Sequence, residues 1–198
     1  MTSSPRVLRR AVVAIAIAVA CAMGVADTWS GPSGAAAEAA LAPGAAERAA
    51  NARGLLRSAR ALVSADPAAL GYRLELAALR PGLRAQTDTR TRTITLFIAH
   101  DDVPHRVAHD LAHEIGHAVD HERLSATARR AFLRRRGIHA TVAWWPRDGR
   151  SDYATGAGDF AEVYALCHAS SPEFRGRLAP RPLEPCALLP IVSQPGGS

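Results

Sequence analysis

The 198-residue chain contains no lysine, so all 24 of its basic residues are arginine, and aromatic residues make up only 5% of it. The lack of lysine accompanies an excess of alanine, glycine and proline, which is typical of a GC-rich coding sequence and says little about function. The shortage of aromatic side chains limits the chain to one modest hydrophobic core. It also leaves no interleaving of aromatic and basic residues of the kind that stacks on nucleic acid bases.

The net charge of +6 is concentrated at the start of the chain. Arg6, Arg9 and Arg10 precede the first acidic residue, Asp27, and without the first 26 residues 21 arginines would face 18 acidic residues. The other arginines are scattered, except for a run at 134–136, and we interpret them as a solvated surface. We therefore expect no nucleic acid partner.

The apolar run at 11–23 is shorter than the 20 or so residues that a membrane span requires. It follows the basic residues and precedes small residues at 24–26, which is the pattern of a secretory signal peptide cleaved before Asp27. Two alternatives stay open: a lipoprotein at Cys21, and an uncleaved anchor if the run extends through Val25. We expect a secreted or extracytoplasmic protein, with anchoring to the cell envelope left open and no membrane association after cleavage.

Composition divides the chain into three parts: a signal peptide at 1–26, a linker at 27–44 and one domain at 45–198. The linker is rich in alanine, glycine, serine and proline and has too little apolar area to fold. Loss of the signal leaves two cysteines, Cys167 and Cys186. In an oxidising compartment we expect them to form a disulfide, and the alternative is two unpaired buried thiols.

Periodicity and turn residues predict an α+β fold that is mainly helical with a small antiparallel sheet. A helix is expected at 45–64, a strand at 72–76, a turn at 81–82 and a second strand at 93–98 that closes a hairpin around Asp88. Helices follow at 104–124 and 126–136, the latter ended by Gly137. After a loop at 144–158, Asp159 is expected to open a further helix, and the tail from 179 onward to be irregular.

Chemistry is concentrated in the pattern His-Glu-x-x-His, formed by His113, Glu114 and His117. Residues four apart on a helix lie on one face, so the two imidazoles can converge on one ion. A catalytic zinc ion uses three protein ligands and keeps one position open. It lowers the pKa of water, and a neighbouring carboxylate takes the proton during attack on a carbonyl. The spacing predicts His113 and His117 as zinc ligands and Glu114 as the general base.

The remainder of this helix has the pattern of a buried element. Val107, Leu111 and Ile115 form an apolar stripe on nearly the opposite face from the two histidines. A stripe of small residues, which admits another helix at close distance, lies at Ala108, Ala112 and Gly116. One side of the helix is therefore expected to face a core and the other a site.

Further histidines continue the four-residue spacing at His105, His109 and His121. Because an α-helix has 3.6 residues per turn, side chains spaced four residues apart rotate gradually around the helix axis, and the outer histidines turn away from the centre of the series. We expect His109 and His121 to be exposed or to support a ligand rather than to bind the ion. Asp120 either accepts a hydrogen bond from a ligand imidazole or is an exposed helix acid.

Two segments together carry a family resemblance. HEIGHAVD at 113–120, followed about 40 residues later by DFAEVYA at 159–165, resembles the catalytic domain of anthrax lethal factor and related gluzincin zinc metallopeptidases. The resemblance covers about residues 70–178. It implies a zincin-like fold with an active-site helix, an edge strand that binds extended substrate, and a later helix that supplies an acidic third zinc ligand.

The third ligand is where this chain departs from the family. In lethal factor the later helix reads Glu-Phe-Phe-Ala-Glu and its first glutamate binds zinc, but the corresponding position here is Gly158. Glu162 lies one turn further on the same face, and Asp159 is the next residue, although Asp-x-x-Glu at a helix start is also a capping box. We favour Glu162 and keep Asp159 as the alternative. Similar peptidases also imply that Tyr153 stabilises the oxyanion, unless it is an ordinary loop tyrosine.

These patterns predict a secreted zinc peptidase that acts on a peptide or protein substrate, and they give no indication of an oligomeric state. Two other readings remain. A non-catalytic protein could use the histidines to buffer or sense zinc or nickel, and the vacancy at Gly158 is compatible with an inactive peptidase-like interaction module. Glu114 favours the peptidase, because a protein that only binds metal does not need a carboxylate between its ligands.

Overall fold

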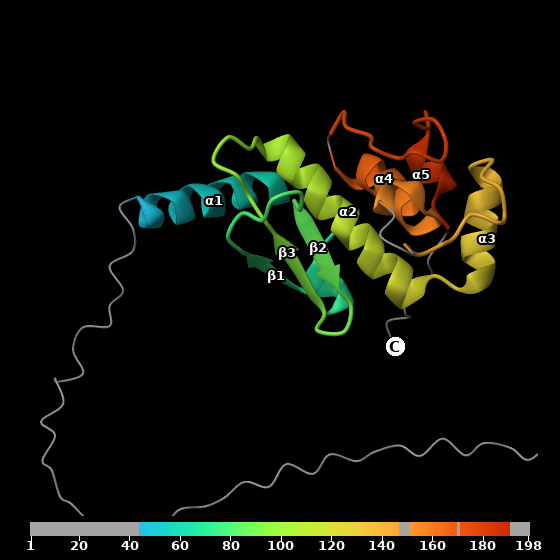
Figure 1. The fold of residues 1–198 in the computed structure, drawn as a ribbon, viewed down its shortest axis with the longest axis horizontal. Coiled ribbons are helices and arrows are strands. Elements are labelled where there is room, and N and C mark those ends of the chain that lie inside the picture. The colour runs from blue at the N-terminus through green and yellow to red at the C-terminus, as the bar shows by residue number, and fades with distance from the viewer. Residues whose placement is uncertain (1–43, 147–150, 170, 191–198) are drawn as a thin grey trace, which may run out of the picture. The chain divides into compact units, whose positions relative to one another are not determined.

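The computed structural model describes residues 44–146, 151–169 and 171–190, so the predicted signal peptide at 1–26 and nearly all of the linker at 27–44 lie outside the described residues. The domain is α+β, as predicted (Figure 1). Its helices are α1 (Ala45–Arg60), α2 (Pro104–Arg123), α3 (Ala126–Arg135), α4 (Gly156–His168) and α5 (Pro185–Leu188), with 3-10 turns η1 (Pro67–Leu70) and η2 (Asp152–Ala154). Its strands are β1 (Arg73–Leu76), β2 (Ala85–Asp88) and β3 (Thr93–Leu96). None of the described helices combines the length and apolar character that crossing a membrane requires.

The three strands form one sheet in the order β1-β3-β2. The predicted hairpin is confirmed: β2 and β3 are antiparallel, and Asp88 Oδ1 accepts the backbone N–H groups of Arg90 and Thr91 in the turn. The prediction of an antiparallel sheet is wrong, because β1 pairs with β3 in parallel. After β1 the chain turns at 80–83 and forms β2 at the opposite edge of the sheet. Strand β3 then lies between β1 and β2 and runs in the same direction as β1.

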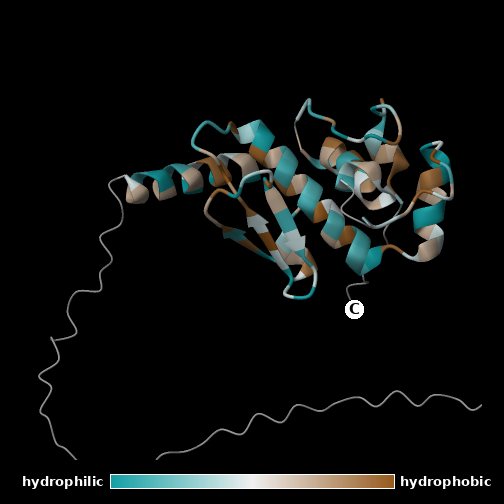
Figure 2. Ribbon diagram, viewed as in Figure 1, coloured by the Kyte–Doolittle hydropathy of each residue, from teal (hydrophilic) through white to brown (hydrophobic). Residues whose placement is uncertain are grey.

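Helix α2 runs through the centre of the domain, with α1 and the sheet on one side and α4 on the other (Figure 1). The predicted apolar stripe of Val107, Leu111 and Ile115 is at most 2% exposed and belongs to one core with Ile94 and Leu96 of β3. Apolar and polar residues alternate along α2, as expected for a helix with two different faces (Figure 2).

The close approach of α2 and α4 depends on the small-residue stripe. A Cβ atom on Gly116 would lie 2.9 Å from Cα of Ala161 and 3.1 Å from Cβ of Tyr164, so only glycine fits there. Ala108 and Ala112 are fully buried. The prediction that this stripe admits another helix is confirmed, and the contact sets the distance between the site residues of α2 and those of α4.

Several helix ends differ from the predictions. Helix α1 ends at Arg60, four residues early, and the tail beyond 179 includes the short helix α5. Helix α4 begins at Gly156 with Thr155 as its cap, whose Oγ1 accepts the N–H of Gly158 at 3.1 Å. Asp159 therefore neither opens the helix nor caps it. Gly137 does end α3, with a φ of 67° that favours glycine.

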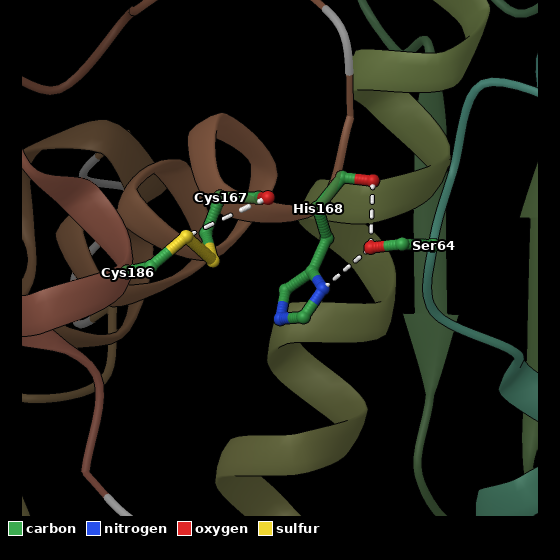
Figure 3. The surroundings of a disulfide bond; sticks show 4 residues. All are labelled: Ser64, Cys167, His168 and Cys186. Atoms are coloured by element: carbon green, nitrogen blue, oxygen red, sulfur yellow. Dashed lines mark hydrogen bonds between the residues drawn. A yellow bond between two sulfur atoms is a disulfide. The ribbon is translucent and has the colours of Figure 1, made fainter.

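The predicted disulfide between Cys167 and Cys186 is present and joins the end of α4 to α5 (Figure 3). The neighbouring residue His168 contacts Ser64, which follows α1: its Nδ1 lies 2.9 Å from Ser64 Oγ, and its carbonyl accepts the N–H of Ser64 at 2.8 Å. The C-terminal end of α4 is thus attached both to the tail and to the segment that follows α1.

Candidate metal centre

Two histidines of α2 and one aspartate of η2 point at one another. The Nε2 atoms of His113 and His117 are 3.2 Å apart, and Asp152 Oδ2 lies 3.1 Å from the first and 3.2 Å from the second. His113 and His117 lie one helical turn apart, which is the origin of their convergence. Asp152 reaches them from across the cleft, with about 35 residues between it and the motif.

This triangle has the dimensions of a metal site. In a tetrahedral zinc site, bonds of about 2.0–2.1 Å place neighbouring ligand atoms about 3.4 Å apart. The three observed separations are close to that value, and each atom is of a type that binds first-row metals. Within the described residues, His113, His117 and Asp152 therefore form a group that can hold a metal ion, with two neutral ligands and one carboxylate.

Asp152 occupies the space that Gly158 leaves free. A Cβ atom on Gly158 would lie 2.2 Å from the Asp152 carbonyl oxygen and 2.6 Å from its Oδ2 atom. Thr155 fixes the same aspartate, because its N–H and its hydroxyl both donate to the Asp152 carbonyl at 2.8 Å. The position that has no ligating side chain in the sequence is thus where a carboxylate from residue 152 lies.

Glu162 lies behind the histidines. It is fully buried, and its Oε1 is 2.8 Å from Nδ1 of His113 and 3.1 Å from Nε2 of His109, while Oε2 accepts the N–H of Arg175. The Nδ1 atom of His113 is on the opposite side of the ring from the Nε2 atom that faces Asp152. The structure does not bring Glu162 to the point where the three ligand atoms converge, and this arrangement does not support its choice as third ligand.

Asp159 lies elsewhere. Both of its oxygens accept hydrogen bonds from Arg136, at 2.7 and 3.0 Å, and both side chains are almost fully buried. This bidentate pair joins α4 to the end of α3, and Asp159 is not among the described residues whose ligand atoms converge. Within the arginine run at 134–136, Arg134 and Arg135 are exposed, as expected for a solvated surface, whereas Arg136 turns into the protein.

Asp120 fits neither of its two interpretations. It is fully buried, and its carboxylate accepts hydrogen bonds from Arg129 at 2.7 Å and from the indole N–H of Trp144 at 2.8 Å. The Arg129 guanidinium also lies over the ring of Trp145, which lines the cleft beside the metal group. Asp120 therefore fixes one wall of the cleft instead of a ligand imidazole.

Glu114 and the metal group line the same cleft, which has a volume of about 880 Å³. The Glu114 carboxylate is mostly buried, and its Oε2 accepts a hydrogen bond from the hydroxyl of Thr87 at 2.7 Å. Thr87 belongs to β2, so the edge strand forms one rim of the cleft and fixes the carboxylate. Glu114 therefore lies in the same cleft as the ligand atoms, with its carboxylate held by Thr87.

Tyr153 lies in the cleft next to Asp152, as the sequence predicted for a site tyrosine. Its ring meets that of His113 edge to face, with 5.5 Å between centroids. Its Oη accepts a hydrogen bond of 3.3 Å from Arg175. Tyr153 thus lies beside His113 in the same cleft.

Hydrogen bonds among His113, Asp152 and Glu162 favour the charged form of each side chain. Burial favours the neutral imidazole of His113, but hydrogen bonds to Asp152 and Glu162 outweigh it and hold the His113 pKa well above its ordinary value. Burial alone would likewise raise the pKa of Asp152 and of Glu162. Their hydrogen bonds to histidines outweigh it and lower the pKa of both carboxyls. A proton on His113 and a metal ion would compete for the same carboxylate-lined space.

The outer histidines differ from one another. His109 is fully buried and touches Glu162, which agrees with a supporting role, and its Nδ1 has no hydrogen-bond partner among the described residues. His121 is exposed at the margin of the cleft, and His105 is exposed at the start of α2. The helical drift thus separates them from the metal group, as predicted.

Sequence reasoning missed Asp152, Thr87 and Arg175. Asp152 had a usable signal, because its neighbour Tyr153 was already expected in the site and Gly158 left a space for a carboxylate. Thr87 and Arg175 had none, since each reaches the site through a contact between segments far apart in the chain.

Comparison with known proteins gives no further guidance: no family model, curated protein or solved structure matches this chain at a significant level. The interpretation of the site therefore rests on the arrangement of the chain's own residues.

Proposed function

We propose that this chain is a zinc-dependent peptidase in which His113, His117 and Asp152 hold the ion and Glu114 is the general base. The observation that carries the proposal is the convergence of His113 Nε2, His117 Nε2 and Asp152 Oδ2 within 3.2 Å of one another. It is supported by the cleft that this triangle shares with Glu114 and Tyr153. Three protein ligands leave one position of a tetrahedral ion open, as in catalytic zinc sites.

A zinc ion bound there would lower the pKa of water toward neutral and polarise a carbonyl group. Glu114 takes the proton of the attacking water and returns it to the leaving amine. Thr87 donates to Oε2 of Glu114, which leaves the other carboxylate oxygen available for that transfer. Tyr153 donates a hydrogen bond from its hydroxyl to the carbonyl oxygen as negative charge develops on it.

Glu162 and His109 are proposed to orient the first ligand. Glu162 accepts a hydrogen bond from the Nδ1–H group of His113, which fixes the ring and leaves Nε2 free to bind metal. His109, held against the same oxygen, keeps the Glu162 carboxylate in place. A carboxylate in this position also raises the basicity of the ligand imidazole.

A peptide is the favoured substrate because β2 forms one rim of the cleft. It is the edge strand of the sheet, and its outer side has no strand partner among the described residues. Backbone N–H and C=O groups on such an edge pair with an extended chain. Peptide bonds of the bound segment would thereby pass in front of the metal group.

Export is proposed together with this activity. The disulfide between Cys167 and Cys186 supports it, because structural disulfides persist in oxidising compartments. The signal peptide predicted at 1–26 would direct the chain there.

Replacement of Glu114 by glutamine tests the peptidase against the metal-binding alternative. Glutamine has nearly the same shape but cannot take a proton, so Glu114→Gln should retain one zinc per chain and lower kcat by about 10³-fold or more. Zinc content by mass spectrometry and cleavage of a peptide library provide the two readouts. A wild-type protein that binds zinc but cleaves no peptide would favour a buffering or sensing role. The convergence of Asp152 on the two histidines supports the peptidase over an inactive module.

A further inference from the structure

The segment that follows α4 passes beside Tyr153 and contacts it twice. Arg177 donates its backbone N–H to the Tyr153 carbonyl at 2.9 Å, and Arg175 donates from Nη1 to the Tyr153 hydroxyl at 3.3 Å. The backbone N–H of Arg175 donates to Glu162. One short segment therefore connects the cleft tyrosine to the carboxylate that lies behind His113.

The guanidinium of Arg175 is fixed by acidic residues. Its Nη1 donates to Asp110 Oδ1 at 2.7 Å, and its Nη2 donates to Glu173. Asp110 is 5% exposed and lies on α2, one turn before His113, and its other oxygen accepts from Arg84 at 2.8 Å. Because acceptors on both sides hold the guanidinium, it presents its remaining donor to Tyr153 in one orientation.

This contact decides where the Tyr153 proton points. The phenolic oxygen accepts a hydrogen bond from Arg175, so its own O–H must find an acceptor elsewhere. No described residue accepts it, and the hydroxyl belongs to a side chain that lines the cleft. A hydrogen bond received from a cation also polarises the O–H group and makes it a better donor.

We propose that Arg175 is the positioning residue for Tyr153: it orients the phenol so that its proton is directed into the cleft, toward the oxygen of a substrate carbonyl. The inference rests on the proposed peptidase function and deepens it. Arg175 acts through Tyr153, since its guanidinium is already committed to Asp110 and Glu173. Because Arg175 also lines the cleft, its effects on kcat and on KM distinguish positioning from substrate binding.

Kinetics of four variants test this assignment. Tyr153→Phe should lower kcat by about 100-fold, the usual effect of losing one donor to a developing oxyanion. Arg175→Met keeps an unbranched, flexible side chain without the guanidinium and should lower kcat by about tenfold, with KM and zinc content unchanged. In the Tyr153→Phe background, Arg175→Met should add less than about a twofold effect, because its target is gone. Arg175→Lys should recover part of the loss.

Two results would overturn the inference. The first is a double variant whose kcat falls by the product of the two single effects, because Arg175 would then act independently of Tyr153. The second is a rise in KM without a change in kcat, which would assign Arg175 to substrate binding. Each of these can be read only when the wild-type protein cleaves a peptide.

A structural measurement decides the matter without catalysis. The chain has three tyrosines, Tyr72, Tyr153 and Tyr164, so ¹³C labelling of the tyrosine Cζ atoms gives three signals, and the one lost in Tyr153→Phe is assigned. Arg175→Met should shift the Tyr153 signal and leave the other two in place. An unchanged Tyr153 signal would overturn the inference. If this shift occurs but no peptide is cleaved, the proposed function has failed while the contact stands.

Discussion

The two walls of the cleft are built in different ways. On one wall His113, Glu114 and His117 lie within two turns of α2, and their relative positions follow from helix geometry alone. On the other wall Asp152 and Tyr153 lie on a three-residue 3-10 turn, and Arg175 lies outside any helix or strand. Their positions depend on contacts with Thr155, Gly158 and one another.

The two walls also differ in how closely spacing along the chain determines them. The helical wall tolerates no change of spacing, because a shift of one residue rotates a side chain by about 100° around the helix. The second wall needs only one carboxylate at the right point, and either a residue of α4 or a neighbouring turn can supply it. Here Gly158 has no side chain, and Asp152 occupies the space that a side chain at position 158 would need.

The largest effect is expected at Asp152. Asp152→Asn removes the charge of the carboxylate proposed as third ligand and should weaken zinc binding by more than about 100-fold, beyond the 10–100-fold typical of residues that only support a ligand. Asp159→Asn is the matched control, since it breaks the pair with Arg136 and should lower stability without changing zinc affinity. Competition with a chromophoric chelator measures both. A folded Asp159→Asn protein that binds no zinc would contradict the assignment.

A smaller effect is expected behind the helical wall. Glu162→Gln keeps the shape of the side chain but loses the charge that holds His113 and His109, and zinc affinity should fall by about 10–100-fold. Glu122→Gln, on the same helix as the two histidines but bonded to Arg92, serves as control and should leave zinc affinity unchanged. Equal affinities in wild type and Glu162→Gln would show that Glu162 has no role in orienting the ligand.

The smallest effect is expected where the sheet meets the helical wall. Thr87→Val removes the hydrogen bond to Glu114 and should lower kcat by about tenfold, the equivalent of about 1.4 kcal/mol, without affecting zinc content. Thr89→Val also changes a cleft residue, but Thr89 has no contact with Glu114 among the described hydrogen bonds, so its kcat should stay within about twofold of wild type. Similar losses in both variants would mean that the rim of the cleft, not the Glu114 contact, is responsible.

What the sequence predicted follows the same division. The helical wall, the burial of its apolar stripe, the close packing at Gly116 and the disulfide could all be read from local patterns, because spacing on one helix and the pairing of two cysteines require no knowledge of the rest of the fold. The supporting position of His109 also followed from helical drift. Each of these depends on geometry within a few residues.

The parts that were missed depend on contacts between distant segments. Asp159 looked like a helix cap because the start of α4 was placed three residues late, and its pairing with Arg136 joins two helices that the sequence does not show to be neighbours. The parallel pairing of β1 was equally hidden, since strand order is not encoded in a strand's own pattern. The sequence placed Asp120 on one face of the helix but gave no indication of its partners, Arg129 and Trp144.

The central claim concerns which three residues bind the ion, and anomalous X-ray scattering tests it most directly. Crystals of the zinc-loaded protein are measured on both sides of the zinc absorption edge. One anomalous peak should lie at bonding distance from His113 Nε2, His117 Nε2 and Asp152 Oδ2, with Glu162 on the far side of the His113 ring. A peak coordinated by Glu162 in place of Asp152, or no peak between the two histidines, would contradict the account.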